Sequence, residues 1–286
     1  MDGWLGIDMG GTATRWVWLG ADGVMQRGEA PGASAMIHDP KLRAGFAAAL
    51  ADVAAALPGR VRAAHLGLTG ARFTRAPEVT TLAATALELA PDRLSHENDV
   101  ELAHRAVFPD GCGHLVLAGT GAVGIGATAR GRAVVGGRGA LLDDRGGAVW
   151  IVLEALRAVY ARHDAIGSFH GAEALAEALG AADWDATRAR VYGDRGALGL
   201  MAPEVARLAA AGCPVAGDVL GRAAAELLAM AEQLESRLGA APLAFIGGVL
   251  RLPGVAENLR AGHPEARFPV PDAARAAAEQ ARRTHP

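Results

Sequence analysis

The stretch GIDMGGTATRW, residues 6–16, places an aspartate, two adjacent glycines and a threonine between two apolar runs. Residues 3–7 and 14–19 are predicted to be strands, so the segment between them is a tight turn. Glycine lets the backbone approach a ligand closely, and threonine adds a hydroxyl donor, so several donors can converge on one phosphate oxygen. Gly10, Gly11 and Thr12 are therefore predicted to receive phosphate, with a plain hairpin turn as the alternative.

Asp8 precedes this turn directly. A carboxylate would repel a phosphate group, but it can hold Mg²⁺ through water, and the cation would neutralise the phosphate charge. We therefore expect Asp8 to face a magnesium ion.

The order of elements around this turn occurs twice along the chain. From residue 3 it runs strand, glycine turn, strand, hairpin and helix, and it restarts with strands at 114–118 and 122–128 and a helix at 147–161. Two α/β domains of similar design are predicted, residues 1–112 and 113–286, with the last helix able to pack back on the N-terminal domain. The remaining predicted elements are strand 24–29, helix 41–57, strand 61–68, helix 78–90, strand 93–97, a mostly helical region 171–240, strand 243–246 and helix 272–283.

The second glycine turn, Gly119, Thr120 and Gly121, offers the same donors as the first at the end of a strand. Two such turns that open two similar domains favour one ligand shared between them. Gly247 and Gly248 follow a buried strand and would let an adenine ring lie against bare backbone. Taken alone, that last pair is better explained by a simple strand-to-helix turn.

Asp99 lies in HENDVELA, at a predicted strand-to-helix junction, where the sites of α/β proteins usually lie. A carboxylate there can accept the proton of an attacking hydroxyl, and it can also cap the helix. The neighbouring Glu97 and Glu101 are expected to be solvated. In GGRGALLDDRGGAVW, residues 136–150, one carboxylate of Asp143–Asp144 could accept hydrogen bonds from sugar hydroxyls or cap the following helix.

Composition excludes several classes of protein. The chain has 286 residues, 51% hydrophobic and 21% charged, with a net charge of -3, so no basic surface for nucleic acid is expected. Lys41 is the only lysine, which rules out a phosphate-binding loop that ends in Gly-Lys. Two cysteines without a CxxC, no signal peptide and no long apolar run indicate a cytoplasmic protein that does not cross a membrane.

Six motifs occur in an order that resembles the N-acetylglucosamine and glucosamine kinases within the BadF/BadG/BcrA/BcrD ATPase family. They are GIDMGGTATR, GLTGA, ENDVELA, LAGTGAVG, GGRGALLDDRGGAVW and FIGGV. This family belongs to the actin-like ATPase, sugar-kinase and Hsp70 superfamily. The resemblance implies an α/β fold of two ribonuclease-H-like domains with an interdomain cleft that closes on ATP and Mg²⁺. A homodimer is common among similar proteins.

The resemblance also implies roles for individual residues. Asp99 matches the general base, and Asp8 lies toward Mg²⁺. The residues that match the family's two phosphate-binding motifs are Gly10, Gly11, Thr12, Gly119, Thr120 and Gly121. Gly247 and Gly248 match its adenosine-binding motif. The residues that match its sugar-binding positions are Thr69, Asp99, Thr120, Gly137 and Asp144.

The sugar side departs from the family pattern. Ala35 stands where an asparagine is common, and Ala122 and Val123 follow the second turn. The loop that usually reads GDxGS contains Arg145 and ends in Gly147. The amino sugar and the hydroxyl that is phosphorylated therefore stay open.

Three functions are compatible with these observations. The first is an ATP-dependent kinase of an amino sugar, with a small-molecule sugar and no nucleic acid as partner. The second is a BadF-type ATPase that activates a dehydratase or reductase, for which two suitably placed cysteines would be expected. The third is a nucleotide-binding regulator without catalysis, although such a protein has no need of a base at Asp99.

Overall fold

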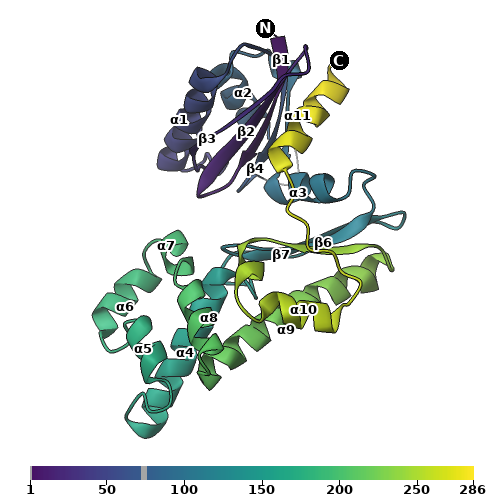
Figure 1. Cartoon of the computed structure of the whole chain (residues 1–286). Helices are drawn as coiled ribbons and strands as arrows, with labels where there is room; N and C mark the ends of the chain where they lie inside the picture. The colour runs from purple at the N-terminus through teal and green to yellow at the C-terminus, as the bar shows by residue number, and fades with distance from the viewer. Residues whose placement is uncertain (1, 72–75) are drawn as a thin grey trace. The chain divides into compact units, whose positions relative to one another are not determined.

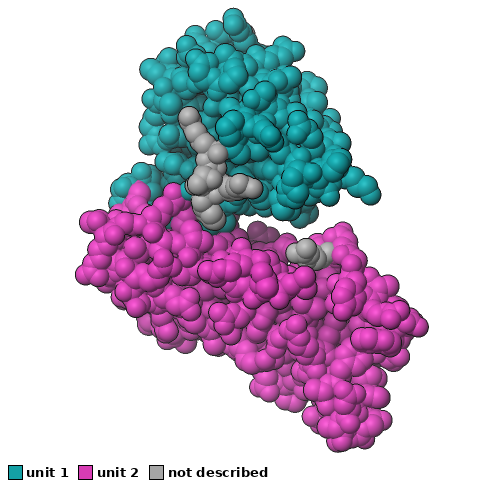
Figure 2. Space-filling model, turned by 180° about the vertical axis from the view of Figure 1, so that it is seen from behind, with its two compact units in different colours: residues 1–110, 271–286 teal, residues 111–270 magenta. Residues whose placement is uncertain are grey.

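The computed structural model describes residues 2–71 and 76–286, and the chain forms two compact units. Unit 1 contains residues 2–110 together with 271–286, and unit 2 contains residues 111–270. Figure 2 colours the two units separately. The division thus falls after Asp110, and the last helix is grouped with the N-terminal unit.

Unit 1 is built on a five-stranded sheet in the order β3-β2-β1-β4-β5. Strands β1 (Asp2–Met9), β2 (Ala13–Gly20) and β3 (Met25–Pro31) form antiparallel hairpins. Strands β4 (Arg60–Leu68) and β5 (Leu94–Asn98) continue the sheet parallel to β1. The carboxyl ends of β1, β4 and β5 therefore share one edge.

Helices cover both faces of this sheet (Figure 1). On one face, α1 (Pro40–Ala56) buries Phe46 and Leu50 and α2 (Pro77–Ala86) buries Val79, in one core with alternate residues of β1. On the other face lie α3 (Asp99–Val107) and α11 (Ala273–Thr284), and a short 3₁₀ turn, η1 (Pro91–Arg93), precedes β5. Helix α2 ends earlier than the predicted 78–90, because Glu88 adopts a left-handed backbone conformation with φ of 53°.

Helix α11 approaches β1 closely because both surfaces lack large side chains. A Cβ at Gly6 would lie 2.1 Å from the carbonyl oxygen of Ala274 and 2.2 Å from the nitrogen of Ala278. The alanines on this side of α11 are buried, at Ala274, Ala277, Ala278 and Ala281. The alanine-rich tail is therefore an integral layer of unit 1.

Unit 2 repeats the hairpin arrangement on a four-stranded sheet in the order β8-β7-β6-β9. Strands β6 (Gly113–Ala118), β7 (Ala122–Thr128) and β8 (Gly131–Gly136) are antiparallel, and β9 (Leu243–Ile246) is parallel to β6. The predicted α/β class and the recurrence of the strand–turn–strand unit are confirmed.

A single apolar core joins the sheet of unit 2 to its helices. The long helix α9 (Pro214–Leu238) and α4 (Ala148–Ile166) supply more of its buried residues than any other elements of the unit. The remaining elements of the unit are α5 (Glu173–Ala178), α6 (Trp184–Val191), α7 (Arg195–Gly199), α8 (Ala202–Ala210), η2 (Gly248–Arg251) and α10 (Val255–Gly262). Within the described residues, no helix has the length and apolar character needed to cross a membrane.

Candidate functional site

In unit 1, the predicted site residues Asp8, Thr69 and Asp99 gather at the shared carboxyl edge of β1, β4 and β5. Asp8 pairs with Gly67 of β4, and Gly67 pairs with Glu97 of β5. The backbone N–H of Thr69 donates to the carbonyl of Met9 at 2.9 Å, which holds the end of β4 beside the end of β1. Parallel strands of α/β proteins present their ligand sites at this edge.

Asp99 is the first residue of α3 and follows the last residue of β5 without a linker. The cap of this helix is Asn98, whose Oδ1 accepts from the N–H of Val100 at 2.9 Å, so the helix does not need Asp99 as its cap. Asp99 Oδ1 lies 3.0 Å from the same N–H. Burial raises the pKa of Asp99, although hydrogen bonds from the Thr69 hydroxyl and the Val100 backbone act in the opposite direction.

Asp8 and Asp99 interact electrostatically. Burial and then the negative charge of Asp99 raise the pKa of Asp8 from 3.8 to about 6. Arg15 lowers this pKa, and Asp272 at the start of α11 raises it. The carboxylates at this edge therefore leave a local excess of negative charge, which a cation would relieve.

This charge excess fits a hydrated Mg²⁺ ion near Asp8. Among the described residues there is no group of three or more His, Cys, Asp or Glu side chains that could hold a metal ion. Mg²⁺ in phosphoryl-transfer sites usually keeps several waters and takes one or two carboxylates with the phosphates of the substrate. Asp8 is suited to that mode of binding.

The first glycine turn joins β1 to β2. The N–H of Gly10 donates to the carbonyl of Ala13 at 3.0 Å, which closes the turn. Gly11 and Thr12 are exposed, and a Cβ at Gly11 would meet no heavy atom within 4 Å. The packing of unit 1 therefore does not require a glycine at position 11.

The second glycine turn, in unit 2, is attached to the start of α4. The N–H of Ala148 donates to the carbonyl of Gly119 at 2.9 Å, and that of Val149 donates to the carbonyl of Thr120 at 3.1 Å. Thr120 is exposed, and a Cβ at Gly119 would meet only Leu117 Cδ2, at 3.8 Å. The carbonyl groups of the turn are thus bonded to the start of α4, while Thr120 is exposed to solvent.

Asp144 lies against this second turn. A Cβ at Gly121 would be 2.4 Å from Asp144 Oδ2, and Asp144 Oδ1 accepts from the N–H of Gly139 at 3.1 Å. The adjacent Asp143 instead forms ion pairs with Arg138 and Arg145. Of the two aspartates in the loop, Asp144 is the one that unit 2 places beside the predicted phosphate turn.

Three further glycines of unit 2 are required by its packing. A Cβ at Gly137 would lie 2.7 Å from Val123, and one at Gly147 would lie 2.6 Å from the backbone of Gly121. Gly247 has φ of 116°, and its Cβ would lie 2.1 Å from the carbonyl oxygen of Ala118. Gly248, which begins η2, has open space instead, with no heavy atom within 4 Å.

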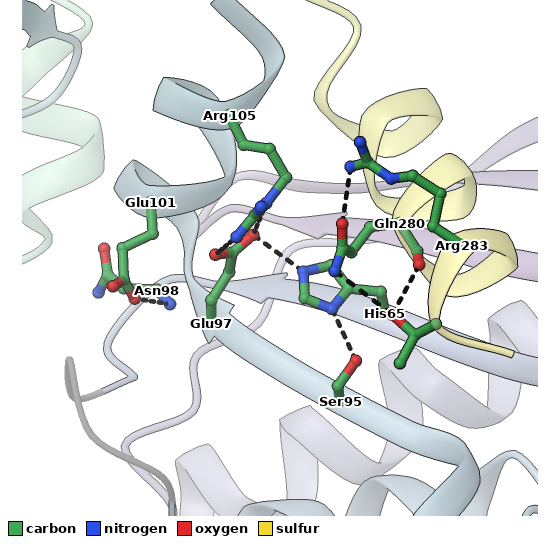
Figure 3. Close-up of polar contacts among 9 residues, drawn as sticks. His65, Ser95, Glu97, Asn98, Glu101, Arg105, Gln280 and Arg283 are labelled. Carbon is green, nitrogen blue, oxygen red and sulfur yellow. Dashed lines mark hydrogen bonds and ion pairs between the residues drawn. The ribbon is translucent and has the colours of Figure 1, made fainter. Parts of the chain in front are cut away.

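The expectation that Glu97 and Glu101 are solvated is wrong. The Glu97 side chain is 11% exposed and pairs with both His65 and Arg105 (Figure 3). Glu101 is buried, and its Oε2 accepts from the N–H of Asn98 at 2.9 Å, which completes a capping box. The spacing of Asn98 and Glu101 is the capping-box signal that could have revealed the role of Glu101.

A family model for the BadF/BadG/BcrA/BcrD ATPases matches residues 5–266. The chain belongs to this family. No protein of curated function matches the chain well enough to count as a relative.

Solved structures resemble this family member over nearly its whole length. A candidate N-acetylglucosamine kinase from Chromobacterium violaceum has a TM-score of 0.70 at 23% identity, covering 97% of this chain and 98% of that one. A second candidate N-acetylglucosamine kinase, from Porphyromonas gingivalis, has a TM-score of 0.66 at 19% identity, with 99% of each chain covered. A ROK family glucokinase from Streptomyces griseus, solved with glucose and AMPPNP, has a TM-score of 0.58 at 18% identity, covering 98% of this chain and 99% of that one. At these identities the resemblance establishes the shared fold.

Proposed function

We propose that the protein is an ATP-dependent kinase that phosphorylates a hydroxyl of an amino sugar, N-acetylglucosamine or glucosamine. Membership of an ATPase family supports the use of ATP. Two of the structures that share the fold are described as candidate N-acetylglucosamine kinases, which supports the substrate class. The observation that carries the proposal is the pair of interacting carboxylates, Asp8 and Asp99, at the carboxyl ends of the parallel strands β1, β4 and β5.

The two carboxylates are suited to different tasks. Asp99 is the proposed general base, because burial raises its pKa and makes it a stronger proton acceptor than a solvated carboxylate. The Thr69 hydroxyl orients this carboxylate. Asp8, with a pKa of about 6, is largely ionised at neutral pH and is the proposed ligand of hydrated magnesium.

In the proposed reaction, Asp99 takes the proton of a sugar hydroxyl as its oxygen attacks the γ-phosphorus of ATP. The bond between that phosphorus and the oxygen that bridges it to the β-phosphate breaks, and ADP leaves with the electron pair. Gly10 and Gly119 shape the two turns, and the proposed donors to the phosphates are the backbone N–H groups of Gly11 and Thr12 in the first turn and of Thr120 and Gly121 in the second. Asp144 and Gly137 belong to the proposed sugar site. Magnesium, when bound, neutralises the phosphate charge that would otherwise repel the nucleophile.

A panel of sugars with Mg·ATP tests the proposal. Release of ADP and ³¹P NMR of the product are measured for N-acetylglucosamine, glucosamine, N-acetylmannosamine and glucose. We expect turnover that depends on an amino sugar and falls by about three orders of magnitude in Asp99→Asn, because the base also orients the nucleophile. Asp92→Asn, at an exposed position, is the matched control and keeps full activity.

Two results would reject the kinase. The first is ADP release that no sugar stimulates. The second is sugar-dependent turnover that Asp99→Asn leaves intact.

A further inference from the structure

Strand β5 and helix α3 carry a partly buried polar network beside the proposed base, in which Glu97 and His65 are shielded while the Arg105 side chain is 37% exposed. Glu97 Oε1 and Oε2 accept from Arg105 Nε at 2.9 Å and Nη2 at 2.8 Å. Glu97 Oε1 also lies 2.8 Å from His65 Nε2, and His65 Nδ1 lies 2.8 Å from Ser95 Oγ. Figure 3 shows these side chains extending from β4, β5 and α3 toward one another.

The hydrogen bonds from Arg105 and His65 strongly affect the pKa of Glu97. Burial alone would raise the pKa of this carboxyl, but hydrogen bonds from Arg105 and His65 lower the pKa to about 2. The carboxyl is therefore ionised at every pH at which the protein would work. Two parallel N–H···O bonds from one guanidinium also fix the angle between the partners, which a single contact would not.

Stability alone is a weak reason for such a network. Removing charges from water carries a large penalty, and well-packed apolar residues of similar size are often as stabilising as a buried ion pair. Unit 1 has many such residues on both faces of its sheet. Charged groups at this position are better explained if they fix the orientation of α3 relative to β5.

The network joins the two elements whose junction presents Asp99. Glu97 lies two residues before Asp99 on β5, and Arg105 lies nearly two turns after it on α3. Because Asn98 is the cap and Asp99 the first helical residue, the direction of α3 sets the direction of the Asp99 carboxylate. Asn98 Nδ2 donates to the carbonyl of Ala71 at 2.8 Å, so the junction is also tied to the segment that follows Thr69.

We propose that Glu97, held by His65 and Arg105, is a positioning residue that fixes the β5–α3 junction and thereby aims the Asp99 carboxylate at the acceptor hydroxyl. The inference rests on the proposed kinase function. A displacement of about 1 Å at a reacting group can lower a rate by about a hundredfold, so a small change in the direction of α3 would affect turnover strongly.

Glu97→Gln tests this role, because it keeps the shape of the side chain but removes the charge. The matched control is Glu154→Gln in α4 of unit 2. Glu154 is similarly shielded, with a side chain 15% exposed, and it also pairs with two arginines, Arg157 and Arg222. Turnover is measured with the best sugar, and amide hydrogen exchange is followed at Val100, whose N–H is bonded to both Asn98 and Asp99.

In Glu97→Gln we expect kcat to fall by about tenfold to a hundredfold, while KM for ATP stays within about threefold. Exchange at Val100 becomes at least about tenfold faster, since the junction loosens. Glu154→Gln changes neither quantity. Arg105→Lys keeps one charged hydrogen bond and gives intermediate values for both.

Four results would overturn the proposal. They are an unchanged kcat in folded Glu97→Gln, a loss of kcat with Val100 exchange unaltered, equal losses in Glu154→Gln, and a wild-type level of both quantities in Arg105→Lys.

If the wild-type protein shows no sugar-dependent turnover, the kinase proposal fails, and unaltered Val100 exchange in Glu97→Gln then rejects the positioning role by itself. If Glu97→Gln does not fold, Ser95→Ala, which removes only the contact to His65, is expected to shift both quantities about threefold, and no shift would reject the role.

Discussion

The pKa of Asp8 is raised by burial and, next, by the negative charge of Asp99 across the carboxyl edge of the unit 1 sheet. The two residues are 91 positions apart in the sequence, and the parallel pairing of β1, β4 and β5 brings them together. Their proximity adds to the effect of burial on the pKa of Asp8, and a cation bound at this edge would offset the negative charge.

The first prediction follows from the direction of this shift. The pKa of Asp8 is about 6 in the folded protein, against 3.8 for an unperturbed aspartate. The folded state therefore binds more protons between these values, and its stability falls as pH rises from about 4 to about 6. Asp8→Asn cannot ionise, so at about pH 7 it should be more stable than the wild type by up to about 3 kcal/mol.

Urea unfolding of the two proteins in chelator-containing buffer, from about pH 4 to pH 8, measures this difference. The gap in stability should close toward the acid end. Asp52→Asn, at an exposed position of α1, should follow the wild type within about 0.5 kcal/mol at every pH. A wild-type protein that gains stability between about pH 4 and pH 6 relative to Asp8→Asn would show that the charge at Asp8 is already compensated.

The second prediction concerns Thr69, whose hydroxyl hydrogen-bonds the Asp99 carboxylate and lowers its pKa. Thr69→Val removes the hydroxyl at constant shape, so the pKa of Asp99 should rise. The acid limb of the plot of kcat/KM against pH should then move to higher pH, and kcat at neutral pH should fall about tenfold. Thr69→Ser keeps the hydroxyl and should keep both values close to wild type. An acid limb that does not move in Thr69→Val would exclude this contact from the function of Asp99.

The third prediction separates glycines that the fold needs from glycines that a ligand needs. A Cβ at Gly11 meets open space, whereas one at Gly121 would lie 2.4 Å from Asp144 Oδ2. Gly11→Ala should therefore melt at the wild-type temperature but lose the stabilisation that Mg·ATP provides. Gly121→Ala should be destabilised by about 1–3 kcal/mol without ligand, because Asp144 must move.

Thermal melts of both variants with and without Mg·ATP make this comparison. Should Gly11→Ala gain as much from Mg·ATP as the wild type, the first turn would not be the phosphate-binding element. In that case the need for a tight hairpin turn would be enough to explain the sequence at residues 10–12.

The sequence predicts the local parts of the fold because short-range patterns encode them. Glycine turns between apolar runs identified both hairpins, and the polar junction at Asp99 identified the start of α3. It could not show which glycines are constrained by neighbours. Gly121 and Gly247 look like ligand-binding glycines in the sequence, yet their neighbours in space are the Asp144 side chain and the Ala118 carbonyl.

The polar network around Glu97 in unit 1 could not be predicted from the sequence for a different reason. Glu97 stands among polar residues just before a helix, a setting typical of solvated side chains. Its partner His65 is 32 residues earlier, and only the register of β4 with β5 brings the two together. Long-range pairing of this kind leaves no periodic signal in either segment.

The fourth prediction concerns the contact between β1 and α11. Gly6→Ala would place a Cβ 2.1 Å from the carbonyl oxygen of Ala274 and 2.2 Å from the nitrogen of Ala278, and a backbone cannot yield as a flexible side chain does. Helix α11 must therefore move away from the sheet, and the expected loss of stability is at least about 1–3 kcal/mol.

Gly45→Ala in α1 is the matched control, because its Cβ would meet no heavy atom within 4 Å and alanine favours a helix by up to about 1 kcal/mol. In urea unfolding the two glycine-to-alanine changes should shift the midpoint in opposite directions. Gly6→Ala should also speed amide exchange in residues 273–284, since a displaced α11 loses its buried alanine face. Equal midpoints for Gly6→Ala and the wild type, with exchange in α11 unaltered, would mean that the last helix does not depend on close packing against β1.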